Sequence, residues 1–144
     1  MLTVNVDLGE RSYPIVIGGG LLGDEDLSAK VSQEMLRQGK VVIVTNDIVA
    51  PLYLVQTEAF FAARDCASII LKDGEAHKTL AAVESIYEFL LSNKYDRHTT
   101  LVALGGGVVG DITGFAAATY LRGIDFMQIP TTLLAQVDSS VGGK

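Results

Sequence analysis

The chain has 144 residues, of which 49% are hydrophobic and 19% are charged, as is typical of a single globular domain and not of a disordered segment. Its net charge of −6 argues against nucleic acid as a partner, because no basic stripe offsets the acidic excess. Small anionic ligands remain compatible with this charge, since backbone dipoles can bind phosphate on an acidic protein.

Targeting and membrane signals are missing from the sequence. The first residues, MLTVNVDLGERSY, have neither the basic nor the apolar region of a secretory signal. No uninterrupted apolar run approaches the ~20 residues that span a bilayer. Cys66 is the single cysteine, which excludes an intrachain disulfide and fits a small strand residue in a reducing compartment. We therefore expect a cytoplasmic protein with no membrane partner.

The first elements predicted along the chain are a β-hairpin and a helix. Leu2–Leu8 alternates apolar and polar residues, and Tyr13–Ile17 follows the turn-like segment Gly9–Ser12; together they predict two paired strands. Asp26–Gln38 places apolar residues at helical spacing and precedes Gly39, a residue that favours the end of a helix.

The rest of the chain alternates between strand and helix patterns. The expected strands are Lys40–Thr45, Ala67–Leu71, Thr100–Leu104 and Phe126–Ile129, and the expected helices are Ile48–Ala63, Leu80–Leu91 and Val109–Leu121. Such alternation predicts right-handed crossovers and a mostly parallel sheet. We therefore expect residues 1–144 to form one Rossmann-like α/β domain, with helices on both faces of the sheet and an N-terminal β-hairpin.

Distinctive residues follow the first two strands of this sheet, at the edge where open α/β sheets bind ligands. Asp47 follows the first strand, where a carboxylate is placed to accept hydrogen bonds from a ribose diol; the alternative is that it caps the next helix. Asp73 and Gly74 form a turn signal after the second strand. Glu75 and Lys78 share a face if the segment is helical, or they form a solvated surface pair.

A glycine-rich turn follows the third strand. Gly105, Gly107 and Gly110 satisfy G-x-G-x-x-G between a strand and a helix, so that backbone N–H groups can approach a pyrophosphate. The ordinary dinucleotide fingerprint opens its domain and has an acid at the next strand end, whereas Asp125 stands before its strand. The turn is thus a phosphate-type loop of another kind. Gly114 in the next helix predicts close approach by a neighbouring element.

A polar segment follows the fourth strand. Thr131 and Thr132 offer hydroxyl groups to a ligand, and a cluster of polar residues comes next: Gln136, Asp138, Ser139, Ser140 and Lys144. Gly143-Lys144 is not the end of a P-loop, because Asp138 occupies the position of the first glycine. His77 and His98 lie in separate segments and do not meet the ligand needs of a catalytic zinc ion.

Two collinear stretches, GGGVVGDITGFAAATYLRG and QIPTTLLAQVDSSVGGK, closely resemble the 3-dehydroquinate synthases of the shikimate pathway. The resemblance extends upstream through LGERSYPIVIG, VTNDIVAPLY and LKDGEAHK, and so covers essentially the whole chain. It implies a phosphate-eliminating lyase that acts as a cyclase in chorismate and aromatic amino acid biosynthesis. The substrate in this family is a phosphorylated sugar acid, 3-deoxy-D-arabino-heptulosonate 7-phosphate, which becomes 3-dehydroquinate and phosphate.

The same resemblance implies NAD as a cofactor that is used and regenerated in each turnover, with a zinc or cobalt ion as Lewis acid. Carried over residue by residue, the cofactor-binding positions are Asp47, Asp73, Gly74, Glu75, Lys78, Gly106, Gly107, Val108, Val109, Gly110, Asp111, Thr131, Thr132 and Lys144. Asp138 and Lys144 match catalytic and substrate-binding positions. Arg122 matches an arginine that one subunit of a homodimer offers to its neighbour's substrate phosphate.

The family's metal ligands, a glutamate and two histidines, belong to a helical second domain that has no counterpart up to Lys144. We therefore expect an isolated NAD-binding domain, with no metal ligands of its own, that is inactive alone. Two alternatives are a related sugar-phosphate cyclase of the 2-deoxy-scyllo-inosose synthase type and a non-catalytic NAD-binding or dimerisation module. Metal-dependent glycerol or alcohol dehydrogenases fit less well, because they lack the VDSSVGGK ending.

Overall fold

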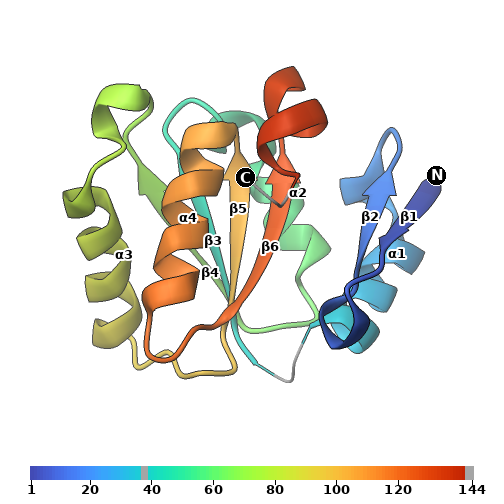
Figure 1. Cartoon of the computed structure of the whole chain (residues 1–144), viewed down its shortest axis with the longest axis horizontal. Helices are drawn as coiled ribbons and strands as arrows, with labels where there is room; N and C mark the ends of the chain where they lie inside the picture. Colours follow the sequence, from blue (N-terminus) through green and yellow to red (C-terminus); the bar gives the residue numbers. More distant parts are fainter. Residues whose placement is uncertain (37–38, 142–144) are drawn as a thin grey trace.

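The computed structural model describes residues 1–36 and 39–141. Its centre is a four-stranded sheet in the order β4-β3-β5-β6 (Figure 1). All neighbouring strands in this sheet are parallel. The strands are β3 (Val41–Asn46), β4 (Cys66–Leu71), β5 (Thr100–Gly105) and β6 (Asp125–Pro130). This arrangement confirms the predicted parallel sheet.

Helices cover both faces of the sheet, as the sequence predicts. On one face lie α3 (Leu80–Ser92) and α4 (Gly107–Thr119). On the other lie α1 (Glu25–Lys30), a π-helical turn and α2 (Ala50–Phe60). Because both faces are covered, β3 and β5 are buried along their whole length. Their sequences are accordingly near-continuous apolar runs without a polar face.

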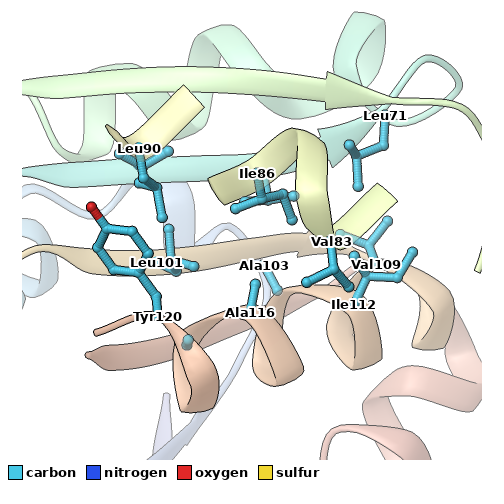
Figure 2. Packing of buried hydrophobic residues seen from close by; sticks show 13 residues of the cluster. Leu71, Val83, Ile86, Leu90, Leu101, Ala103, Val109, Ile112, Ala116 and Tyr120 are labelled. Carbon is cyan, nitrogen blue, oxygen red and sulfur yellow. The ribbon is translucent and has the colours of Figure 1, made fainter. Parts of the chain in front are cut away.

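The core between the sheet and α3/α4 is built from residues at helical spacing. Figure 2 shows Ile86 and Leu90 of α3 and Ala116 of α4 pointing toward Leu101 and Ala103 of β5. Ile86 and Leu90 have no exposed surface, and full burial of such a side chain contributes about 1.5–3 kcal/mol. On the opposite face, apolar residues of α1, the π-helical turn and the end of α2 pack on the sheet, among them Leu27, Val31, Phe60 and Phe61.

The N-terminal hairpin is confirmed, with a shorter first strand. β1 (Leu2–Val6) pairs antiparallel with β2 (Tyr13–Ile17). The strand stops before Leu8 because the Leu8 N–H donates to Ser12 Oγ at 2.9 Å, and Gly9 adopts a positive φ of 64°. Figure 1 places this hairpin beside α1, at one side of the main sheet.

Helix boundaries differ from the predicted ones for local reasons. The predicted first helix begins at Glu25, with Asp24 accepting from the Leu27 N–H at 2.9 Å, and passes into a π-helical turn at Val31–Met35. Its predicted last residue, Gln38, lies outside the described residues. The glycine turn is tight enough that α4 begins at Gly107, two positions earlier than its apolar periodicity indicates.

The strand order creates a topological switch point between β3 and β5. From β3 the chain moves outward to β4, and from β5 it moves outward to β6 on the opposite side. The loops that leave the carboxyl ends of β3 and β5 therefore diverge, because the helices that follow them, α2 and α4, lie on opposite faces. In open α/β sheets ligands bind in the crevice outside this point.

Candidate functional site

The segments singled out in the sequence are brought together at the carboxyl edge of the sheet. Parallel pairing aligns the ends of the strands, with Asn46 opposite Leu71 and Gly105 opposite Pro130. The segments that follow β3, β4, β5 and β6 consequently all leave from one edge. The predicted cofactor residues from Asp47 to Thr132 lie in these segments.

Asp47 is held at this edge by the loop that follows β4. Its Oδ2 is 2.9 Å from Lys72 Nζ, and its Oδ1 accepts from the Asp73 N–H at 3.0 Å. The hydrogen bond from Lys72, followed by that from the Asp73 backbone, lowers the pKa of the Asp47 carboxyl below its ordinary 3.8. Asp47 is therefore an oriented carboxylate at neutral pH, with lone pairs left for a diol.

The capping alternative for Asp47 is wrong, because the N-cap of α2 is Val49 and no side chain makes a capping hydrogen bond there. Asn46 Oδ1 accepts from the N–H groups of Ile48 at 3.2 Å and Val49 at 2.8 Å. Asn46 Nδ2 in turn donates to Asp73 Oδ1 at 2.6 Å. Asn46 and Lys72 are thus site residues without a predicted role. An asparagine directly after an apolar strand is the signal for such a turn, and Asn46 holds the turn that leads from β3 to α2.

Glu75 and Lys78 meet as the helical spacing predicts, and Lys78 also reaches the glycine turn's helix. A short 3₁₀ turn at Glu75–His77 follows Gly74, which has a positive φ of 108°. Lys78 Nζ lies 3.6 Å from Glu75 Oε1 and 2.8 Å from Asp111 Oδ2. Lys78 thereby joins the loop after β4 to α4, and the carboxylates of Glu75 and Asp111 both stay largely exposed to solvent.

The glycine turn brings backbone close to its surroundings. A Cβ atom on Gly105 would lie 2.8 Å from Val109 Cβ, one on Gly106 would lie 3.1 Å from Thr132 Cγ2, and one on Gly107 would lie 3.1 Å from Ser139 Oγ. The N–H groups of the first helical residues precede the first hydrogen bond within α4. They give the amino end of α4 the character of an anion site.

The other predicted residues of the turn take different places. Val108 is half-buried, whereas Val109 is 2% exposed and packs in the core, so a contact with a cofactor would involve its backbone. Gly110 faces Gln128, and Gly114 faces the ring of Phe126. The latter contact confirms the close approach that Gly114 predicts.

The segment after β6 folds back over the glycine turn. The Thr131 N–H donates to the Gly105 carbonyl at 3.0 Å, and Thr132 Oγ1 accepts from the Ala135 N–H at 3.2 Å. A π-helical turn, Ala135–Ser139, follows and includes the exposed Asp138. Buried hydroxyl oxygens of Thr131 and Ser139 have no hydrogen-bond partner among the described residues. Lys144 lies outside the described residues.

Arg122 is the one described site candidate that the fold keeps apart from the others. It lies between α4 and β6. Because α4 runs back from the carboxyl edge, this loop is at the amino edge of the sheet, the end opposite to the glycine turn (Figure 1). Arg122 is exposed there.

The described residues offer neither a metal site nor a reactive thiol. No three His, Cys, Asp or Glu side chains gather as a metal site in residues 1–36 and 39–141. Burial raises the pKa of the Cys66 thiol to about 11, with Glu58 and Asp65 adding to the shift, so the thiol is protonated at neutral pH. In the same residues, no helix has the length and apolar content needed to cross a bilayer.

Sequence comparison identifies relatives along the whole chain. The family described as 3-dehydroquinate synthase N-terminal matches residues 68–144. The 3-dehydroquinate synthase of Methylococcus capsulatus is 56% identical over 144 residues, and that of Colwellia psychrerythraea is 58% identical over 144 residues. Each alignment covers 100% of this chain, which spans 39% and 40% of those relatives, respectively.

Solved structures of sugar-phosphate cyclases share the fold. A 2-deoxy-scyllo-inosose synthase complexed with carbaglucose-6-phosphate, NAD+ and Co2+ has a TM-score of 0.85 at 25% identity, over 96% of this chain and 38% of that one. A 2-epi-5-epi-valiolone synthase from Streptomyces hygroscopicus with NAD+ and Zn2+ bound has a TM-score of 0.75 at 29% identity, over 95% and 37%. Because the family match, the sequence identity over the whole chain and the shared fold agree, the chain belongs to the 3-dehydroquinate synthase family.

Proposed function

We propose that this chain is the NAD-binding domain of a 3-dehydroquinate synthase, formed by residues 1–144 as one unit. The observation that carries the proposal is the convergence of Asp47, Lys78 and the glycine turn at the switch point between β3 and β5. A ribose-binding carboxylate and a helix N-terminus for pyrophosphate are the two anchors that a dinucleotide needs.

The residues present fit NAD. The absence of side chains at Gly106 and Gly107 lets a ligand approach the amino end of α4, and the buried Thr131 hydroxyl has no partner among the described residues that would compete with a ligand. In this arrangement Asp47 binds the adenosine ribose, and Lys78 faces the cofactor together with Glu75. The other proposed contacts are those of Asp73, Gly74, Val108, Val109, Gly110, Asp111, Thr132 and Lys144.

The proposed activity is that of the curated relatives, the conversion of 3-deoxy-D-arabino-heptulosonate 7-phosphate to 3-dehydroquinate and phosphate. NAD, when bound, supplies reversible oxidation of an alcohol; the chain's own residues bind and orient it. Asp138 and Lys144 are the proposed catalytic residues of this chain at the junction with substrate. The described residues do not by themselves gather the ligands of a metal ion.

We also propose that the protein acts as a homodimer in the cytoplasm. Arg122 is exposed at the amino edge, opposite to the proposed NAD site of its own chain, which supports a role at a neighbour's substrate phosphate. A guanidinium suits that task because it binds phosphate with two parallel hydrogen bonds. The cytoplasmic location is supported by the free thiol of Cys66, because free thiols are typical of reducing compartments.

A related cyclase is the second candidate. The high TM-score to 2-deoxy-scyllo-inosose synthase favours a common fold for the two activities. Sequence identity separates them, at 56% to a 3-dehydroquinate synthase and 25% to the inosose synthase. A non-catalytic NAD-binding module is the remaining alternative, and it shares the cofactor site proposed here.

Isothermal calorimetry with NAD tests the cofactor site directly. We expect measurable binding by this chain and a loss of roughly 10- to 100-fold in affinity for Asp47→Asn, because hydrogen bonds to a charged acceptor contribute about 1.5–3 kcal/mol. Asp65→Asn is the matched control, since Asp65 pairs with Lys40 at 3.2 Å in the same way but precedes β4 at the amino edge. Absence of binding by the folded chain, or equal losses in the two variants, would reject the site.

A further inference from the structure

We propose that Asn46 is a positioning residue for the adenosine end of the NAD site and sets the direction of the Asp47 carboxylate. The inference rests on the proposed function and deepens it. Asn46 is the last residue of β3 and is 5% exposed, whereas Asp73 beside it is exposed and Asp47 is partly exposed. A polar side chain buried at this depth needs hydrogen-bond partners within the protein.

The amide oxygen of Asn46 fixes the backbone at Asp47. It accepts from the N–H groups of Ile48 and Val49, which turns the chain sharply out of the strand. The Asp47 N–H donates to the Leu71 carbonyl at 3.0 Å on the neighbouring strand. These hydrogen bonds on both sides of Asp47 fix its backbone, so that its side chain points toward the loop after β4.

The amide nitrogen of Asn46 holds Asp73, whose backbone N–H is a hydrogen-bond partner of Asp47. It donates to Asp73 Oδ1 at 2.6 Å, and the Asp73 N–H donates to Asp47 Oδ1 at 3.0 Å. These two hydrogen bonds and the peptide bond between Asn46 and Asp47 join the three residues in a ring. Asn46 holds Asp73 in place, and Asp73 in turn orients the Asp47 carboxylate. Lys72 completes the arrangement from the other side of that carboxylate.

Asparagine suits this position because the ring needs an acceptor and a donor on one short side chain. An aspartate would retain the acceptor for Ile48 and Val49. It would lose the donor, and its carboxylate would face that of Asp73 across a hydrogen-bond distance. The variant N46D therefore separates the positioning role from the turn at Ile48 and Val49, because only the hydrogen bond to Asp73 is lost.

The first test is the affinity for NAD as a function of pH. We expect N46D to bind NAD about tenfold more weakly than the wild-type chain near pH 8. Affinity should recover near pH 5, because protonation of one carboxylate restores a donor between positions 46 and 73. Asp47 stays ionised there, since its pKa is lowered. The control D24N makes the reverse exchange of amide and carboxylate at the cap of α1, remote from the site, and should bind normally at both pH values.

A double-mutant cycle tests whether Asn46 acts through Asp47. If it does, N46D combined with D47N binds NAD no more weakly than D47N alone. Additive losses would show that Asn46 affects binding by another route and would overturn the proposal. A purely structural role would not produce both this non-additivity and the recovery at acid pH.

Hydrogen exchange separates failure of this inference from failure of the proposed function. In the wild-type chain without NAD, the Asp73 N–H should be protected by Asp47, and in N46D at pH 8 it should exchange faster. If the wild-type chain does not bind NAD, the cofactor proposal fails, whereas the exchange result still decides whether Asn46 positions Asp73 and Asp47. Unchanged exchange in N46D would overturn the inference.

Discussion

At the scale of single residues, the ligand edge is organised by charge pairs that join different loops. Asp47 is paired with Lys72 after β4, and Asp111 of α4 is paired with Lys78. These side chains are partly or largely exposed, so water and salt weaken their attraction and they add little to stability. Their effect is to give the carboxylates and the ammonium group fixed directions before a cofactor arrives.

Lys78 provides a test of this pairing. Its hydrogen bond to Asp111 raises the pKa of the Lys78 ammonium above the ordinary 10.5, with further contributions from the charges of Asp111 and Glu75. The stabilisation from the raised pKa is fully present below the ordinary value and is lost as pH rises through the raised one. We expect Asp111→Asn to bring the pKa of Lys78 back toward 10.5.

An NMR titration of the Lys78 side chain measures this pKa in the wild-type chain and in the variant. Glu84→Gln is the control. It removes a carboxylate of α3 that does not contribute to the raised pKa of Lys78. An unchanged Lys78 pKa in Asp111→Asn would mean that the ion pair does not form in solution.

At the scale of elements, the glycine turn between β5 and α4 is constrained by its own helix. A methyl group on Gly105 would lie 2.8 Å from both Cβ and Cγ2 of Val109, whose side chain is buried. We expect Gly105→Ala to lower the free energy of unfolding by about 1–3 kcal/mol, because overpacking forces the backbone to shift. Urea denaturation followed by circular dichroism gives the change.

Gly114→Ala is the matched comparison, made in the middle of the same helix. Its methyl group would lie 3.2 Å from Phe126 Cε1, and this ring is 38% exposed and so has room to move. Alanine also favours the helix over glycine by up to about 1 kcal/mol. We therefore expect Gly114→Ala to be nearly neutral or stabilising. Equal destabilisation by both substitutions would show that the contact with Val109 is not what requires glycine at position 105.

Sequence periodicity predicts the elements here more completely than it predicts their ends. The continuous apolar runs of β3 and β5 indicate buried strands, because both faces of the sheet are covered. The π-helical turn at Ala135–Ser139 has no such signal, since its polar residues have no apolar period and its fold depends on Thr132 and the glycine turn. The turn held by Asn46 is not predicted for a different reason, because Asn46 and Asp47 are adjacent and both favour turns.

At the scale of the whole molecule, the arrangement of the site follows from strand order, which the sequence alone does not reveal. Any parallel order would bring the loops after β3 to β6 to one edge. Only an order that places β3 beside β5 puts Asp47 next to the glycine turn at a switch point. Arg122 lies at the far edge for a different reason, because α4 runs back from the glycine turn to the amino edge before the loop that carries Arg122.

This separation leads to a prediction for the assembled enzyme. In a full-length member of the family that carries these residues, Arg122→Ala and Asp138→Asn should each abolish most activity as pure homodimers. If Arg122 serves the neighbouring subunit, a heterodimer of the two variants contains one intact site, formed by the Asp138 of one chain and the Arg122 of the other. Random mixing of equal amounts makes about half of the dimers heterodimers, so roughly a quarter of wild-type activity should return.

The mixture is prepared by co-refolding or co-expression, and phosphate release is followed against the two unmixed variants as controls. Mixing Arg122→Ala with a second inactive variant at Arg122, such as Arg122→Gln, tests for non-specific recovery, because no chain in that mixture supplies the guanidinium. Recovery only in the first mixture requires a dimer with shared sites. If Arg122 acted within its own chain, every site in the heterodimer would lack one of the two residues and the mixture would stay inactive.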